Sequence, residues 1–417
     1  MSDASAPRPV AEADDRMRKA AFWISAAVVS HMMWTSAAPA LVYRLYAEQW
    51  HLSPAAITAI FAVYPIVVVA VLLLFGNLSD VVGRRAAMTL GVSFSLAGVA
   101  LFATSTGLGA LFAGRALMGV GVGLSAGPAT AALVDYSPVG RAGIAGPMNA
   151  AAQSFGMSAS LIMGGALIEY APYPTRTTFV LLAVLLAFLL VAMRRLPAPP
   201  AASTWARWRP SKPVVAASQR RPFLIAMASM TTAYTHGALL LSLGGHIVHD
   251  LIGSSNALVS GVMLAFFPLT LGLAGVLSRR LPPPTLVTWG AFGSLSGMAL
   301  LALAVATRSI ALMFVATAVS GAGYSFQVSG GLSTLTAASQ LQTRGGLVSA
   351  SLLVAYLAMG SSAVALGLAA NRWGLAVAAD IAAAAVATLS IVTWAIARFK
   401  NSSLPTPSSA RSCDAVA

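Results

Sequence analysis

Three charged side chains stand close together in a short polar segment of an otherwise apolar chain. The segment reads Gly76-Asn77-Leu78-Ser79-Asp80-Val81-Val82-Gly83-Arg84-Arg85, and it separates apolar stretches near residues 56–75 and 86–105. A carboxylate and two guanidiniums at this spacing can form ion pairs, and a carboxylate near a helix N-terminus interacts favourably with the helix dipole. This charge density predicts that the segment is more than a passive connection between two helices.

Two histidines could carry protons within other apolar stretches of the chain. His31 and His236 lie at corresponding depths in the first and seventh stretches. Imidazole has an ordinary pKa near 6.5, so a proton gradient can change its charge. Asp380, in the last stretch, is a third candidate because a buried carboxylate can also take up a proton. Each histidine could instead only line a cavity or join two helices by a hydrogen bond.

The composition indicates that lipid is the solvent of most of this chain. Hydrophobic residues make up 58% of the 417 residues, only 9% are charged, and the mean hydropathy is +0.81. Soluble domains have about 25% charged residues. Backbone groups in hydrocarbon must pair within their own segment, which predicts an all-α integral membrane protein with twelve transmembrane helices. The twelve expected helices lie near residues 20–43, 56–75, 86–105, 109–134, 145–168, 177–193, 222–246, 257–277, 285–305, 310–336, 346–369 and 374–397.

The distribution of basic residues predicts the orientation. With a cytoplasmic N-terminus, 20 of the 25 basic residues face the cytoplasm, and only Arg44, Arg176, Arg308 and Arg372 face outward. This is the positive-inside rule, so we expect both termini in the cytoplasm of a bacterial inner membrane. It also accounts for the net charge of +14 without nucleic acid, because the basic residues are spread over loops next to the membrane.

The expected chain organisation has two halves. A basic, proline-containing segment separates two sets of six apolar stretches, and Gly275-Val276-Leu277-Ser278 in the second half repeats the pattern of Gly76-Asn77-Leu78-Ser79 in the first. We expect a disordered leader, an N-terminal six-helix bundle, a cytoplasmic linker, a C-terminal six-helix bundle and a disordered tail, at residues 1–17, 18–193, 194–221, 222–398 and 399–417.

The polar segment resembles a signature of the major facilitator superfamily, G-x-L-x-D-x-x-G-R-R, at every defining position. The resemblance implies two pseudo-symmetric six-helix bundles around a central substrate site, and secondary transport by alternating access. It also implies a network that closes the cytoplasmic side. The expected gate residues are Gly76, Asp80, Gly83, Arg84, Arg85 and, at the inner end of the fourth span, Asp135.

Two further segments resemble motifs of the same superfamily. Arg115 fits the fourth-helix pattern L-x-x-x-R-x-x-Q-G-x-G, with Met118 in place of the glutamine. An arginine inside a membrane helix costs about 2.5–3.5 kcal/mol and normally faces the protein interior or water. Gly156, Gly164 and Gly165 fit the antiporter pattern G-x-x-x-G-P-x-x-G-G, although Ser160 replaces a glycine and Leu161 replaces the proline. These matches favour the drug/proton antiporter branch.

Aromatic and amide side chains at mid-depth predict the substrate cavity, although any one of them could serve only a helix–helix hydrogen bond. The expected cavity residues are His31, Trp34, Tyr64, Arg115, Asn149, Gln153, Tyr234, His236, Tyr324, Gln327 and Tyr356. His246, His249 and Asp250 have a spacing that could bind a metal, but their position is typical of a wet helix end. We therefore predict no metal and no cofactor.

The sequence predicts a monomeric transporter that uses protons to export drug-like compounds or metabolites. One alternative is uptake of a small organic anion, because Arg115 and the histidines make the cavity mildly positive. A membrane sensor that binds a ligand without moving it is the alternative from another class. An enzyme is not expected, because no nucleophile–base set or metal cluster is evident.

Overall fold

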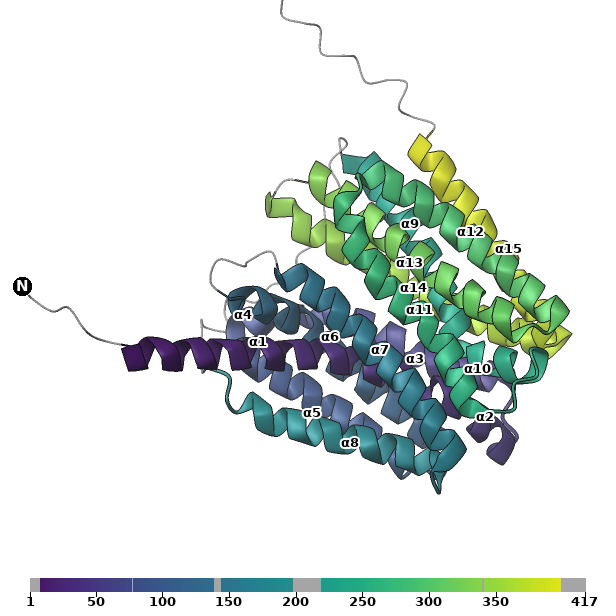
Figure 1. The fold of residues 1–417 in the computed structure, drawn as a ribbon, viewed down its shortest axis with the longest axis horizontal. Coiled ribbons are helices and arrows are strands. Elements are labelled where there is room, and N and C mark those ends of the chain that lie inside the picture. Colours follow the sequence, from purple (N-terminus) through teal and green to yellow (C-terminus); the bar gives the residue numbers. More distant parts are fainter. Residues whose placement is uncertain (1–7, 77, 139–143, 198–218, 340, 399–417) are drawn as a thin grey trace, which may run out of the picture.

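Helices form the whole of the regular structure in the computed structural model, which describes residues 8–76, 78–138, 144–197, 219–339 and 341–398 (Figure 1). For residues 8–15, Asp80 and residues 341–345 it describes the backbone only. The helices of the first half are α1 Arg8–Ala37, α2 Pro39–Trp50, α3 Pro54–Phe75, α4 Leu78–Val82, α5 Arg84–Ala103, α6 Leu108–Asp135, α7 Ala145–Tyr170 and α8 Pro174–Met193. Those of the second half are α9 Arg220–Ser242, α10 Gly244–His246, the π-helical turn η4 Ile247–Leu251, α11 Ala257–Leu277, the 3₁₀ turn η5 Ser278–Arg280, α12 Pro283–Thr307, α13 Ile310–Ala338, α14 Leu341–Trp373 and α15 Leu375–Arg398.

Within these segments, eleven helices are long and apolar enough to cross a membrane, where the sequence predicted twelve. The first expected span, 20–43, is divided between α1 and α2 at Ala38. Pro39 has no N–H to continue the helical hydrogen bonds, although Ala38 before it keeps helical dihedral angles and donates a 2.8 Å hydrogen bond to the Trp34 carbonyl. Helix α1 begins at Arg8, inside the segment predicted to be a disordered leader, while the expected linker and tail lie largely outside the described residues.

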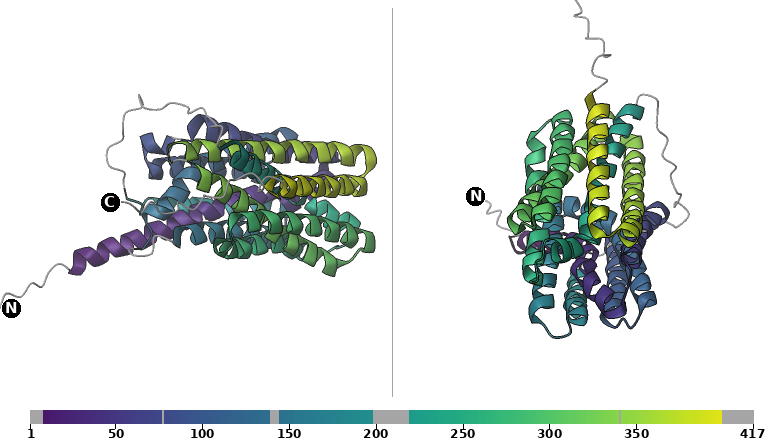
Figure 2. Two further views of the ribbon diagram at one scale, coloured as in Figure 1. Left: turned by 90° about the horizontal axis from the view of Figure 1, so that it is seen from above. Right: turned by 90° about the vertical axis from the view of Figure 1, so that its right-hand side faces the viewer.

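The long helices run side by side in roughly one direction (Figure 2). Helices α1–α8 lie on one side of the molecule and α9–α15 on the other (Figure 1). Two pairs of long helices make most of the contact between the two sides, α7 with α11 and α3 with α14. The side chains that face a central site therefore come from helices of both halves.

Glycines allow the joining helices to approach closely. A Cβ at Gly165 of α7 would lie 2.5 Å from the Ala257 carbonyl oxygen of α11. At Gly272 of α11 a Cβ would lie 2.5 Å from the Ser154 side chain, whose hydroxyl donates a hydrogen bond of 2.6 Å to the Pro268 carbonyl. Small residues support this kind of packing in membranes because they bring two backbones into van der Waals contact.

The two halves are also in contact at the end of the molecule where α2 and α10 lie. Helix α2 packs against α10, and a Cβ at Gly245 would lie 3.2 Å from the Ala40 carbonyl oxygen. The Glu169 carboxylate at the end of α7 accepts a 2.7 Å hydrogen bond from the Ala257 N–H at the start of α11. A carboxylate at a helix N-terminus is stabilised by the helix dipole. Together these contacts close the side on which α2 and α10 lie.

Candidate functional site

Three tyrosines from three helices of the second half form an aromatic cluster. Tyr234 of α9 stacks on Tyr324 of α13 with ring centroids 5.9 Å apart, and it meets Tyr356 of α14 edge-on at 5.0 Å. Phe267 of α11 lies edge-on to Tyr324 at 5.5 Å. The three tyrosines are only half-buried. Their rings and hydroxyls are thus able to contact a solute.

The first half contributes a fully buried cation. Arg115 of α6 has no exposed surface, and its guanidinium lies over the rings of Tyr64 and Phe61 at 4.6 and 5.6 Å from their centroids. It donates a 3.2 Å hydrogen bond to the Ser36 carbonyl oxygen. Among the residues that the structure describes, no carboxylate pairs with Arg115; its neighbours are the two aromatic faces, the Ser36 carbonyl and the buried side chain of Tyr43. Such cation–π contacts are worth about 2 kcal/mol when they are shielded from water.

Tyr64 connects these two groups across the halves. Tyr64 lies on α3, which packs against α14 and α9, the helices that carry Tyr356 and Tyr234, and the Arg115 guanidinium lies over its ring. The Tyr64 hydroxyl and the Nε and Nη2 atoms of Arg115 are buried without a hydrogen-bond partner in the described protein. Buried donors normally have partners, so these atoms are available to a solute or to water. We call Tyr64, Arg115, Tyr234, Tyr324 and Tyr356 the central cluster.

The two histidines have different neighbours and lie inside opposite halves. The Nδ1 atom of His31 is 2.5 Å from the Val28 carbonyl oxygen, and its Nε2 atom is 3.4 Å from the Ser95 hydroxyl of α5. His236 has no exposed surface, and its ring lies 6.1 Å from that of Phe267. Both ring nitrogens of His236 lack a partner among the described groups. The structure therefore does not bring the two rings to one common cavity.

Four other expected cavity residues and Asp380 lie away from the central cluster or make no recorded contact with it. Trp34 borders a lateral cavity of about 590 Å³ between α1, α7 and α8, together with His31. Asn149 accepts a 3.4 Å hydrogen bond from Thr130, and Gln153 of α7 is half-buried. Gln327 is fully buried on the face of α13 that packs against Gly290 of α12. Asp380 is exposed on α15.

The expected gate residues lie between α3 and α5, at the opposite end of the molecule from α2. Arg84 forms an ion pair with Asp135 at the end of α6. Gly83 has a φ of 84°, a conformation that favours glycine, and Gly76 ends α3. The Arg85 side chain does not join this ion pair and instead donates a 2.9 Å hydrogen bond to the Leu196 carbonyl oxygen just beyond α8. The side chain of Asp80 lies outside the described residues.

Some residues of the central site carried only a weak signal in the sequence. Phe61 and Tyr64, three positions apart on α3, present two rings on one helix face, and this spacing could have identified Phe61 as a partner of Arg115. Phe267 looks like any apolar residue of its span. Ser36 contributes a backbone carbonyl, which residue type does not reveal.

Comparisons with known proteins identify the family and the fold. A profile of the Major Facilitator Superfamily matches residues 23–362. No curated protein matches the sequence significantly. Among solved structures, a variant of the nucleoside transporter NupG has a TM-score of 0.73 at 12% identity, covering 91% of this chain and 99% of that one.

Two further solved structures have the same fold. A variant of a POT peptide transporter in complex with sulfate has a TM-score of 0.74 at 16% identity, covering 90% of this chain and 93% of that one. A bacterial homologue of the human lysosomal transporter Spinster, in an inward-facing and unoccupied conformation, has a TM-score of 0.68 at 14% identity, covering 91% and 96%. At these identities the likeness establishes the fold alone. Because the family profile spans most of the sequence, this chain belongs to the major facilitator superfamily, a family of membrane transporters.

Proposed function

We propose that the protein is a proton-driven exporter of a small aromatic molecule, related to the drug/proton antiporter branch of its family. The observation that carries this proposal is the central cluster, in which Tyr64 and Arg115 come from one half and the three other tyrosines from the second. A solute held between two halves is exposed to alternate sides when the halves move relative to each other.

The chemistry of the central cluster favours a neutral or anionic solute. Tyrosine offers an aromatic face and a hydroxyl, and the guanidinium of Arg115 has two nitrogen atoms without a protein partner. An organic cation could lie on the tyrosine faces, but the buried guanidinium of Arg115 over Tyr64 would repel it unless a carboxylate neutralised one of the two charges. Asp380 is exposed on α15, and Asp135 is paired with Arg84. Neither carboxylate is available to neutralise a cation at the central cluster.

Proton coupling is assigned to His31 or His236, the buried titratable groups nearest to mid-depth in α1 and α9. A carrier that exchanges a solute for a proton needs a group that is protonated from one side and deprotonated to the other. His31→Gln and His236→Gln should each weaken uphill transport more than downhill exchange. If the double variant still concentrates the solute as well as the unchanged protein, another group carries the proton.

Export is supported by the small-residue face of α7, which retains most of the antiporter pattern. Gly156 packs against the Ser30 carbonyl of α1, and the Ser160 hydroxyl donates a 3.1 Å hydrogen bond to the Trp34 carbonyl. Uptake of a small organic anion is the second candidate, and the fully buried Arg115 is the observation that favours it. Both candidates need the same central cluster, and they differ in whether the solute moves against the proton or together with it.

A flux measurement with three probes of different charge tests this function. Proteoliposomes would be loaded in turn with radiolabelled chloramphenicol, benzenesulfonate or phenyltrimethylammonium, which are neutral, anionic and cationic aromatic solutes. We expect exchange of the neutral or the anionic probe above the level of protein-free liposomes, and none of the cation. Exchange of the cation alone would overturn the assigned substrate chemistry. Binding of a probe without flux would indicate a sensor.

A further inference from the structure

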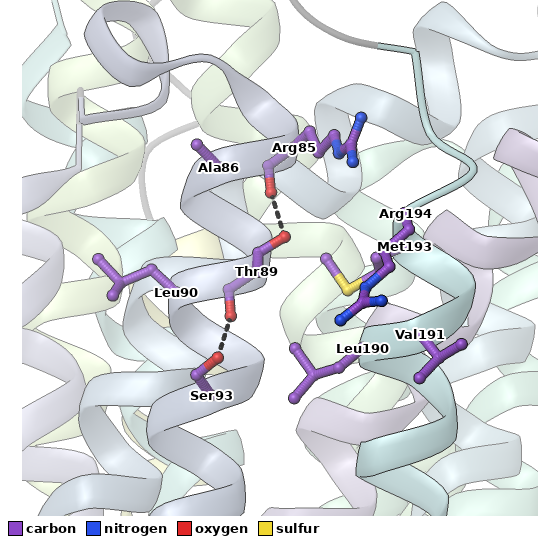
Figure 3. Close-up of a pocket in the computed structure, with 9 residues that line it drawn as sticks. All are labelled: Arg85, Ala86, Thr89, Leu90, Ser93, Leu190, Val191, Met193 and Arg194. Atoms are coloured by element: carbon purple, nitrogen blue, oxygen red, sulfur yellow. Dashed lines mark hydrogen bonds between the residues drawn. The ribbon is translucent and has the colours of Figure 1, made fainter.

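A basic groove lies at the surface between α5 and α8, away from the central cluster. Its volume is about 700 Å³, and Figure 3 shows its nine lining residues. Two of them are cations, two carry hydroxyls and five are apolar, namely Arg85, Arg194, Thr89, Ser93, Ala86, Leu90, Leu190, Val191 and Met193. None of the nine is acidic. The groove is therefore positively charged at one end and apolar along its walls.

The two arginines stand where α5 begins and α8 ends. Both helices are membrane spans, so this end of the groove lies at the membrane surface, on the side of the gate residues. Arg85 is held in place by its hydrogen bond to the Leu196 carbonyl oxygen. Arg194 is exposed, and in Figure 3 its guanidinium reaches between the two helices. Within the described chain, the Arg194 side chain makes no recorded hydrogen bond or ion pair.

The hydroxyls of the groove are already committed to their own helix. Thr89 donates a 2.8 Å hydrogen bond to the Arg85 carbonyl oxygen, and Ser93 donates one of 2.9 Å to the Thr89 carbonyl oxygen. These hydroxyls therefore cannot donate a hydrogen bond to an anion without losing the hydrogen bond to their own helix. Recognition of a negative group rests on the guanidiniums, which bind phosphate oxygens through parallel N–H donors.

The apolar side chains below the arginines provide a surface on which an acyl chain can pack. Leu90 and Val191 are 45% and 59% exposed, and they lie on helices that cross the membrane. Exposed apolar side chains at this depth contact lipid tails. An occupant with an anionic head at the membrane surface and an apolar body below it would satisfy both parts of the groove. Membrane proteins bind anionic lipids in such basic pockets between helices on the cytoplasmic side.

We propose that this groove is a binding site for an anionic phospholipid of the inner leaflet, whose phosphate group is held by Arg194 and Arg85. The site is separate from the central cluster, because no lining residue belongs to it. A lipid bound here would join the inner ends of α5 and α8. This inference does not depend on the direction of transport or on the transported solute.

Native mass spectrometry of the purified full chain tests the proposal. The protein would be titrated with phosphatidylglycerol, and separately with phosphatidylcholine, in the same detergent. Arg194→Gln should weaken phosphatidylglycerol binding about fivefold, since one basic residue near a membrane surface contributes roughly 1 kcal/mol. Arg195→Gln is the matched control, because Arg195 is also exposed and carries the same charge but does not line the groove.

Each outcome bears on the proposal. Stronger binding of phosphatidylglycerol than of phosphatidylcholine, with a loss in Arg194→Gln and none in Arg195→Gln, supports it. Equal binding of both lipids, or equal losses in both variants, overturns it. Inorganic phosphate is the competitor that tests a free anion as the occupant, and complete displacement of the lipid by millimolar phosphate would overturn the lipid assignment. Thr89→Val, which changes only a committed hydroxyl, should bind the lipid normally.

Discussion

The close approach of α7 and α11, at the end of the molecule near α2 and α10, predicts a strong effect of a single added methyl group. In Gly165→Ala the new Cβ would lie 2.5 Å from the Ala257 carbonyl oxygen and 3.1 Å from the Leu258 Cα, whereas ordinary contacts begin at 3.4 Å. Both neighbours are backbone atoms, so the helices must separate by about 1 Å. Such overpacking costs about 1–3 kcal/mol. If the state in which α7 and α11 are separated escapes this cost, the population with the two helices in contact falls by about 5- to 150-fold relative to it.

Labelling of a buried residue at this end of the molecule measures the change in that population. Ser254 is 5% exposed and borders the contact between the halves, so Ser254→Cys in a Cys413→Ser background reports opening. We expect a membrane-impermeant maleimide to label it at least fivefold faster with Gly165→Ala. The control is Gly164→Ala, because a Cβ there has its nearest neighbour, Leu41 Cδ1, at 4.0 Å. Equal rates in the two variants would refute the packing argument.

A second variant tests the same packing argument in case Gly165→Ala does not fold. A Cβ at Gly261 of α11 would collide with the Leu161 carbonyl oxygen of α7, so Gly261→Ala should accelerate labelling in the same way. Thermal unfolding of each purified variant would show whether it is folded. Faster labelling in a folded Gly261→Ala protein would support the account even if Gly165→Ala failed to fold.

Two further substitutions separate structural from functional roles. Asp135→Asn breaks the exposed ion pair with Arg84, so it should change the unfolding free energy by about 1 kcal/mol or less. We expect this variant to lose exchange flux clearly while its expression stays normal. Unchanged flux would argue against a gate. Arg115→Met replaces a buried charge by an apolar side chain, so the protein should remain folded in a thermal-unfolding assay. Loss of one charged hydrogen bond should weaken benzenesulfonate binding about tenfold or more, and unchanged affinity would make Arg115 purely structural.

The sequence predicted the membrane helices well because each one is a local property of the chain. A run of about twenty apolar residues must become a helix in hydrocarbon, wherever it lies in the fold. The first span was the exception, since Pro39 divides it and the aromatic and polar residues of α1 lower its hydropathy. The break was visible in the sequence as a proline, although the direction of the chain after it was not.

The central cluster was harder to predict because it depends on how each helix is rotated. Tyr234, Tyr324 and Tyr356 come together, yet Gln327 lies only three residues after Tyr324 and faces α12. Gly290 of α12 creates the space into which Gln327 packs, and this pairing joins positions that are far apart in the sequence. The faces of nearly uniformly apolar helices cannot be assigned from periodicity, since their apolar residues show no preferred side.

Gradient-driven flux tests the central claim, proton-coupled export, most directly. Proteoliposomes with an acidic interior would be diluted into alkaline buffer containing radiolabelled chloramphenicol or benzenesulfonate. A proton–solute exchanger accumulates the probe because protons leave as the probe enters, whichever way the protein is inserted. We predict accumulation above that of protein-free liposomes, abolished when nigericin collapses the pH gradient. Accumulation only with an acidic exterior would instead indicate uptake together with protons, and no accumulation in either gradient would contradict proton-coupled transport of these solutes.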